Sequence, residues 1–327
     1  MGFVQEPYTN RTINRFINHQ IQRLIKYRNN PGAFWAVSKH LLASPTFQVA
    51  CFHHVFTNWH RKMPYYKVMI IMKKVIALTE QIIRGQTPPI SFKRLFIPKG
   101  NGKSRPLEIP APEWRVVLHS INILMTVFFT PYQSPNQHGF WPGRGTDTAW
   151  KQIHTEVLGN ANIYEFDLEA FFDRINLTYI DQILESINLH PTMRKIIDTL
   201  NRSLPISGGK LPQDWESEQE HLEDVIYYYT KFRISLNNTL SIWLARLYYE
   251  YKLIDNPQLC EFEYLRGVPQ GSPLSPLLAS IALHPTLLKA PSIVQYADDG
   301  IIYDTTNPSQ YLTFPPQKWD QSKCREN

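Results

Sequence analysis

Cysteine is scarce in this sequence, and long apolar runs are missing from it. The three cysteines, Cys51, Cys260 and Cys324, are odd in number and far apart, and no CxxC pair or zinc-ligand spacing is present. This pattern excludes a disulfide framework and a cysteine zinc site, and it favours a reducing compartment. The longest apolar runs, such as residues 121–129, are too short to span a bilayer, so no membrane partner is expected.

Acidic residues are nearly absent from the first third of the chain. Residues 1–105 contain 17 Lys and Arg but only two acids, Glu6 and Glu80, which is a net charge of +15. The remaining residues carry 17 basic and 26 acidic side chains, a net charge of −9. This asymmetry predicts that the N-terminal part meets a polyanion such as a nucleic acid. A basic helical surface without a partner is the alternative.

The N-terminal part shows helical periodicity. Apolar residues in the segment 11–28 recur at i, i+3 and i+4, with basic residues between them, which predicts a helix that stops at Pro31-Gly32. This helix either binds RNA or another acidic surface, or packs its apolar stripe on the core. Residues 33–84 are also predicted to be helical, with breaks near Pro45 and Pro64.

The predicted secondary structure changes from helix to strand at residue 91. Apolar residues on both sides of a Gly-Asn-Gly turn predict a β-hairpin over residues 91–110, with a basic tip. A buried helix is expected over 111–130, and further helices are expected up to about residue 201. Residues 205–224 open with Pro, Gly and Ser and then carry six acids in eleven positions, which predicts a solvated loop. An aromatic helix is expected after it, to about residue 251.

Three aspartates stand where the ligands of divalent cations are expected. Asp167 closes an apolar strand predicted at 162–167, and Asp298 and Asp299 lie in a turn between two short strands. Two-metal phosphoryl transfer needs carboxylate ligands at such strand ends. Adjacent carboxylates repel each other unless a cation is present. Asp-Gly is also ordinary turn chemistry, but the combination with Asp167 favours catalysis.

Five sequence blocks occur in a fixed order between residues 91 and 303, and together they carry a family resemblance. They read RLFIPKGNGKSRPLEIP, QHGFWPGRGTDTAW, YEFDLEAFFDRI, RGVPQGSPLSPLLASIAL and VQYADDGIIY. In text and order these blocks resemble the reverse transcriptases of group II introns. The first 90 residues resemble that family only loosely.

The resemblance implies a metal centre and a triphosphate site. Asp167, Asp298 and Asp299 would bind two Mg²⁺ ions, with Mn²⁺ as an alternative. Lys99 and Arg105 in the basic hairpin would hold the incoming deoxynucleoside triphosphate, which suits a cationic fork. The alternative for these two residues is a solvated hairpin tip.

The resemblance also implies nucleotide and template contacts. Phe172, five residues after Asp167, would block a ribose 2′-hydroxyl and so select dNTPs, although core packing is the alternative reading. Gln270 and Gly271 would line the nucleotide pocket, where the glycine would let the template backbone approach closely. Gly143 and Arg144 would contact the template or shape the fingers, or else form a plain turn.

The implied fold is α+β, a right-hand polymerase with fingers and a ferredoxin-like palm sheet with helices, and with the thumb absent or incomplete. A basic helical extension of the fingers would cover residues 1–90, and fingers with the hairpin would cover 91–160. The palm would cover 161–303, including the acidic insertion at about 205–224. The polar tail, residues 304–327, is expected to be disordered.

The function expected from these features is RNA-directed DNA synthesis for a group II intron or related mobile element. The expected partners are an RNA template, a DNA or RNA primer, dNTPs, intron RNA, and a second chain that supplies a thumb. The competing readings are a catalytically impaired, maturase-like RNA-binding protein and a non-functional remnant. The high content of Phe, Tyr and Ile in the sequence favours an organelle, the mitochondrion, as the location of the protein, with the bacterial cytoplasm as the alternative.

Overall fold

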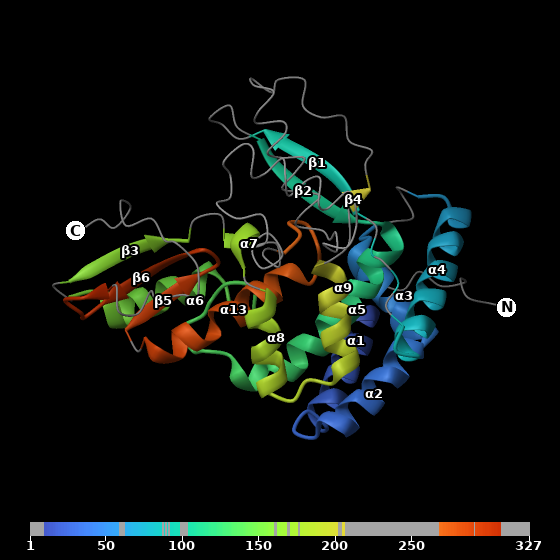
Figure 1. The fold of residues 1–327 in the computed structure, drawn as a ribbon, viewed down its shortest axis with the longest axis horizontal. Helices are drawn as coiled ribbons and strands as arrows, with labels where there is room; N and C mark the ends of the chain where they lie inside the picture. The colour runs from blue at the N-terminus through green and yellow to red at the C-terminus, as the bar shows by residue number, and fades with distance from the viewer. Residues whose placement is uncertain are drawn as a thin grey trace, which may run out of the picture.

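A computed structural model provides the fold. It describes residues 10–58, 63–86, 88, 90, 92–98, 104–159, 162–168, 171–175, 177–201, 205–206, 268–290 and 292–308. Helices form the body of this part, and two separate three-stranded sheets accompany them (Figure 1). The class is therefore α+β, as the sequence predicted.

The four N-terminal helices begin and end close to the predicted breaks. They are α1 (Asn10–Ile25), α2 (Pro31–Ala43), α3 (Pro45–Val55) and α4 (Tyr65–Ile83). Asn30 caps α2, because its Oδ1 accepts a hydrogen bond of 3.0 Å from the backbone N of Ala33. Ser44 caps α3 in the same way, through the backbone N of Phe47 at 3.4 Å. Both helices start with proline, which lacks the amide that a first turn leaves unpaired.

Helix α5 (Pro112–Phe129) is the centre of the core, as predicted for a buried helix. It packs against α1, α3 and α4, and a short helix, η2 (Thr130–Tyr132), follows it. Most side chains of α5 are buried, among them Val117, Leu118, Ile121 and Leu124, all fully buried, while Arg115, His119 and Asn122 form a partly buried polar stripe. A helix that is apolar over most of its circumference needs such a central position, because each buried Leu or Ile contributes roughly 1.5–3 kcal/mol.

Two histidines meet where α3 packs on α5. The Nε2 of His119 lies 3.4 Å from the Nδ1 of His54, whose own Nε2 lies 2.7 Å from the Oδ1 of Asn14. Burial, and then the positive charge of His54, lower the pKa of His119 to about 4. The folded protein therefore keeps this ring neutral at pH values where the unfolded chain would protonate it.

We expect the free energy of unfolding to decrease as the pH falls from about 6.5 to about 4, on the order of 2 kcal/mol from His119. The sign follows from the lowered pKa, since the unfolded chain binds the proton first. Above pH 7 the ring of His119 is neutral in both states, so it does not change the free energy of unfolding with pH. Urea unfolding of His119→Gln should lose the part of the pH dependence that His119 contributes, whereas the exposed His40→Gln should keep the whole of it. An unchanged slope in His119→Gln would contradict this account.

The predicted β-hairpin is present as β1 (Phe92–Pro98) and β2 (Ser104–Pro110), paired from Phe92 opposite Pro110 to Pro98 opposite Ser104. Its free edge is occupied by β4 (Pro205–Ile206), which runs parallel to β1. The predicted loop therefore begins as a strand, because the open edge of β1 offers backbone hydrogen bonds. The acidic positions of that loop and the aromatic helix expected after it lie outside the described residues.

The second sheet consists of β3 (Ile163–Asp167), β5 (Ile293–Tyr296) and β6 (Asp299–Tyr303), in the order β3-β6-β5. One face carries Phe166, Ile293 and Ile302 into the same core as α13 (Ser275–Lys289). The other face contacts α6 (Thr146–Gln152) and the adjoining π-helix η3 (Ile153–Val157) through a smaller cluster around Val294 and Tyr303. Figure 1 shows this sheet at the end of the molecule opposite α4.

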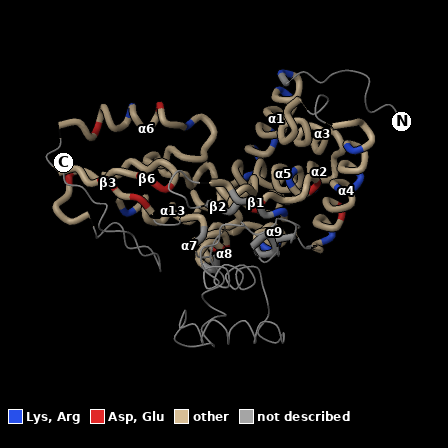
Figure 2. The backbone as a smooth tube through the Cα atoms, turned by 90° about the horizontal axis from the view of Figure 1, so that it is seen from above, with Lys and Arg blue, Asp and Glu red and all other residues tan. Residues whose placement is uncertain are grey.

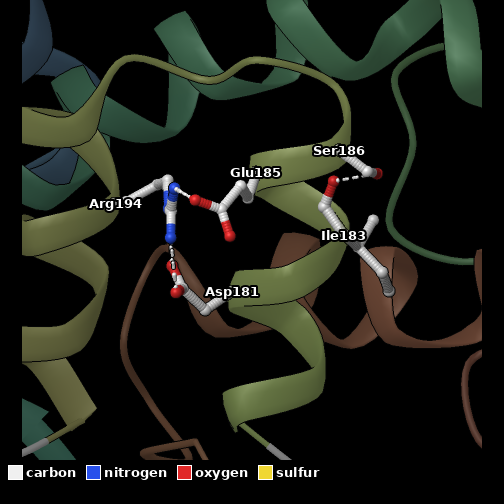
Figure 3. A network of polar contacts seen from close by, with 5 residues as sticks. All are labelled: Asp181, Ile183, Glu185, Ser186 and Arg194. Atoms are coloured by element: carbon white, nitrogen blue, oxygen red, sulfur yellow. Dashed lines mark hydrogen bonds and ion pairs between the residues drawn. The ribbon is translucent and has the colours of Figure 1, made fainter.

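Three helices continue the chain after β3: α7 (Phe171–Arg174), α8 (Leu177–Ser186) and α9 (Pro191–Asn201). Arg194 of α9 joins α8 through two hydrogen bonds to the carboxylate of Asp181, of 2.8 and 2.7 Å, and one to Glu185, of 2.7 Å (Figure 3). These carboxylates hold the pKa of Arg194 well above its usual value. Such half-exposed pairs each contribute up to about 1 kcal/mol, so they fix the packing of the two helices more than they stabilise the fold.

The first residues of the predicted tail are ordered. The backbone N of Asp304 donates to the carbonyl of Asn162 at 3.2 Å, which extends the edge of the sheet by one residue. Residues 309–327 lie outside the described part. None of the helices described has the length and apolar character needed to cross a bilayer.

Candidate active site at the ends of paired strands

Two of the predicted aspartates face each other across the second sheet. Asp167 ends β3 and is paired with Asp299, which begins β6. Directly opposed residues of antiparallel strands point to the same face, with Cβ atoms about 5 Å apart. The third, Asp298, lies in the adjoining turn, where its carbonyl accepts a hydrogen bond of 2.9 Å from the backbone N of Leu168. The fold therefore gathers all three predicted aspartates at one edge of the sheet.

The turn that carries Asp298 has two residues, because Tyr296 and Asp299 on either side of it are paired. Its first residue, Ala297, has a φ of 57°, in the left-handed region that such hairpins need and that alanine rarely adopts. Gly300 lies within β6 rather than in the turn. A Cβ on it would come within 2.3 Å of the ring of Phe166. The reading of this Asp-Gly pair as turn chemistry is therefore wrong, because the glycine makes room for a buried ring.

A cavity of about 600 Å³ opens between the aspartate face of the sheet and α6. Polar and aromatic side chains share its lining: Glu165, Asp167, Tyr296, Asp299, Thr146 and Trp150. Sequence reasoning missed Glu165, Tyr296 and Trp150. Glu165 could have been predicted, because successive side chains of a strand point to opposite faces. Glu165 precedes Asp167 by two residues and so lies on the same face. The contribution of α6 could come only from tertiary packing.

The carboxylates suit a divalent cation in their chemistry. Asp167 and Asp299 share one face and one cavity, and carboxylate oxygen is the ligand that Mg²⁺ and Mn²⁺ prefer. Two carboxylates this close repel each other, so a cation between them would be stabilising. In the part of the chain that the structure describes, no three His, Cys, Asp or Glu side chains converge on one point. The described residues therefore offer a cation two opposed carboxylates, Asp167 and Asp299, with Asp298 in the adjoining turn.

Backbone contacts connect three of the predicted nucleotide-binding residues, Phe172, Gln270 and Gly271, to neighbouring segments. The N of Val268 donates to the carbonyl of Phe172 at 2.7 Å, and the carbonyl of Gln270 accepts a bond of 2.7 Å from the N of Glu108 in β2. Gly271 has a φ of 108°, and a Cβ on it would lie 3.1 Å from the carbonyl of Glu108. The close approach that requires glycine is therefore to strand β2, whereas the expected approach of a template backbone stays a prediction.

Of the two basic residues predicted to hold the triphosphate, Lys99 and Arg105, only Arg105 is within the described residues. Lys99 lies outside them. Arg105 belongs to β2, where its backbone is paired with Ile97 and precedes Glu108 by three residues. Strand β2 thus connects the position of Arg105 to the loop that contains Gln270.

Gly143 and Arg144 lie in a loop that crosses beside the second sheet. The Nη1 of Arg144 donates to three carbonyls, those of Ser134 (3.3 Å), Pro135 and Gln137 (3.0 Å). Gly143 has a φ of 74° and no atom near the position of a Cβ, so its conformation rather than crowding favours glycine. These contacts show that Arg144 shapes the loop, and its contact with a template stays a prediction.

The same loop supports the aspartate turn, which the sequence did not reveal. The backbone N of His138 donates to the carbonyl of Gln295 at 2.8 Å, and the N of Gln295 donates to Asn136 at 2.9 Å. Next to them, a Cβ on Gly139 would lie 2.4 Å from the backbone N of Ala297. The loop and the turn are therefore packed backbone against backbone.

Comparisons with known proteins match most of this region. The family model described as reverse transcriptase (RNA-dependent DNA polymerase) matches residues 97–314. A Schizosaccharomyces pombe protein named "Uncharacterized 91 kDa protein in cob intron" is 26% identical over 192 residues, covering 59% of this chain and 18% of that protein. The "Group II intron-encoded protein LtrA" of Lactococcus lactis subsp. cremoris is 27% identical over 213 residues, 65% of this chain and 27% of LtrA.

A shorter match lies in a bacterial protein. "Protein YkfC" of Escherichia coli (strain K12) is 28% identical over 104 residues, which cover 30% of this chain and 27% of YkfC. The chain therefore spans less than a third of the length of each of these relatives.

Proposed function

Because the chain belongs to the reverse transcriptase (RNA-dependent DNA polymerase) family, we propose that it performs RNA-directed DNA synthesis for a group II intron or related mobile element. The observation that carries this proposal is the pair of Asp167 and Asp299, opposed on neighbouring strands beside a cavity. The name of the relative LtrA, a group II intron-encoded protein, supports the choice of element.

The proposed architecture assigns fingers to residues 1–160, with a basic helical extension in residues 1–90, and a palm to residues 161–303. The second sheet would be the palm sheet, and the hairpin β1–β2 would reach toward the incoming nucleotide. Support for the division comes from the distance in space between the hairpin β1–β2 and the second sheet (Figure 1), although β4, from within residues 161–303, pairs with β1.

The proposed metal centre consists of Asp167, Asp298 and Asp299, holding two Mg²⁺ ions or, as an alternative, Mn²⁺. When bound, such ions activate the primer hydroxyl and offset the charge on the triphosphate. The carboxylates themselves would orient the primer end in the cavity beside Trp150 and Tyr296.

The proposed nucleotide site lies between β2 and the segment around Phe172. Lys99 and Arg105 would hold the triphosphate, since a cationic fork matches its oxygens. The Phe172 ring would exclude a ribose 2′-hydroxyl, and Gln270 and Gly271 would line the pocket. The hydrogen bonds that join Phe172, Gln270 and Glu108 in β2 support a single pocket.

The proposed template and intron RNA contacts lie on the basic N-terminal helices and on the loop around Gly143 and Arg144. Lys and Arg are spread over α1 and α4 in Figure 2, and the exposed Lys67 and Lys73 lie on α4. RNA binding through such residues should weaken steeply with salt. For a single strand, the logarithm of the binding constant should fall by about 0.7 per phosphate contact for each tenfold rise in salt concentration. A binding constant without salt dependence would contradict the assignment.

Mg²⁺-dependent extension of oligo(dT) on poly(rA) tests the proposed reaction directly. We expect incorporation of dTTP that stops when EDTA is added and returns with excess Mg²⁺ or Mn²⁺. The reason is that the opposed carboxylates cannot stabilise the transferred phosphate without a cation. Absence of extension at any metal concentration would reject DNA synthesis by this chain alone.

A catalytically impaired, maturase-like RNA-binding protein is the second candidate. The basic N-terminal helices favour it, as does the lack of three converging carboxylates within the described residues. Tight, salt-sensitive RNA binding without extension would support it.

The proposed location is the mitochondrion, with the bacterial cytoplasm as the alternative, since the relatives include a yeast and two bacterial proteins. Detection of the protein in purified mitochondria would test that location.

A further inference from the structure

The geometry points to Phe140 as a positioning residue for sugar selection: its ring holds the ring of Phe172 at the nucleotide site. Phe140 lies in the loop between η2 and α6, and none of the site residues discussed above includes it. The inference rests on the proposed function, in which Phe172 excludes the 2′-hydroxyl. It adds a residue on which that exclusion depends.

The ring of Phe172 lies between two edge-to-face contacts. Its centroid is 5.9 Å from that of Phe140, with an interplanar angle of 82°, and 5.8 Å from that of Phe171, with an angle of 71°. Phe171 is buried in the core, so it is a fixed support on one side. Phe140 supplies a second ring contact from another part of the chain. Edge-to-face pairs restrict the orientation of a ring as well as its position.

Phe140 is held by its backbone rather than by burial. Its side chain is 42% exposed, and its φ is 65°, a conformation that bulky residues rarely adopt. Such a conformation persists only when the surrounding structure enforces it. On one side Gly139 packs against the backbone of Ala297. On the other side Trp141 is buried, and its Nε1 donates to the Oε1 of Gln137 at 2.8 Å.

The loop therefore connects the aspartate turn to the ring that would select the sugar. Gly139 contacts the turn that carries Asp298, and the next residue contacts Phe172. A substrate sugar would have to fit between the metal-binding carboxylates and the Phe172 ring. Loss of the Phe140 ring would leave Phe171 as the only ring contact of Phe172 among the described residues, and the exposed side of the Phe172 ring could then tilt away from a 2′-hydroxyl.

The test is the selectivity for dTTP over UTP, measured as the ratio of their kcat/KM values in primer extension. We expect Phe140→Ala to lower this ratio by about three- to tenfold, in line with the loss of one aromatic pair, with dTTP incorporation changed less than twofold. Phe140→Tyr keeps the ring and should restore the ratio. Phe172→Ala should lower it further than Phe140→Ala.

Tyr132→Ala is the matched control. Tyr132 is also a partly exposed aromatic residue, 38% exposed, with a ring contact to Phe129 at 5.7 Å. Its replacement removes a comparable contact away from the site and should leave the ratio unchanged. An unchanged ratio in Phe140→Ala, or an equal loss in Tyr132→Ala, would overturn the inference.

A readout independent of activity separates this inference from the proposed function. A double-mutant cycle on the unfolding midpoint, with Phe140→Ala and Phe172→Ala, should show that the two losses are not additive. Additive losses would mean that the rings do not support each other, which rejects the inference even in an active polymerase. A wild-type chain that extends no primer would reject the proposed function and sugar selection with it, whatever the cycle shows.

Discussion

Replacement of Asp167 or Asp299 by Asn should lower the rate of primer extension by on the order of 10³-fold. The two carboxylates are opposed on paired strands and line the same cavity, so each would be a metal ligand that Asn replaces with a neutral amide. Single-turnover extension at saturating Mg²⁺ measures the effect. The fold should survive, because Asn is nearly isosteric and relieves the repulsion between the two carboxylates.

Asp304→Asn is the matched control for this experiment. Asp304 directly follows β6, at the end opposite Asp299, and its side chain is exposed. This variant also removes one negative charge from the same hairpin, so a general charge effect would appear in it. Extension that persists in Asp167→Asn at near wild-type rate would show that the aspartate pair is not the catalytic centre.

Gly139→Ala should lower the free energy of unfolding by about 3 kcal/mol and reduce primer extension more than tenfold. The added Cβ would lie 2.4 Å from the backbone N and 3.0 Å from the Cα of Ala297. A backbone cannot move aside as the end of a flexible side chain can. The turn that carries Asp298 would therefore be displaced. Urea unfolding and extension assays on the same preparation measure both effects.

Gly32→Ala provides the comparison for the glycine experiment. It lies in the first turn of α2, where the nearest atom to an added Cβ, the Oδ1 of Asn30, is 3.6 Å away. That is an ordinary contact distance, so stability and activity should stay close to those of the wild type. If Gly139→Ala behaved like Gly32→Ala, the loop would not be packed on the aspartate turn.

Local patterns in the sequence predicted most of the elements. Proline and capping residues fixed the helix boundaries at Pro31, Pro45 and Pro64, and the apolar flanks of the Gly-Asn-Gly turn predicted the hairpin. The strand that ends at Asp167 and the two strands beside the Asp298-Asp299 turn were predicted from short apolar runs next to acids, although β6 already begins at Asp299. These features depend on neighbours within a few residues, which is why periodicity and turn chemistry reveal them.

Other features were misread or missed because their causes lie far away in the chain. Gly300 was read as a turn residue, but it makes room for the ring of Phe166 on another strand. Pro205–Ile206 was expected in a loop, but the open edge of β1 makes it a strand. No local pattern marks either contact.

The sequence by itself determined that the N-terminal third is basic, that Asp167 ends a strand and that Asp298 lies in a turn between strands, because charge and hydrophobic periodicity are local properties; the α+β class was implied by the family resemblance of its sequence blocks. Only the tertiary structure decided that Asp167 is opposed to Asp299, and that α6 closes a cavity over them. It also decided that the loop at Gly139 and Phe140 supports both the aspartate turn and Phe172. Those arrangements arise from strand register and from close packing between segments that are not neighbours in the sequence, which a linear pattern does not specify.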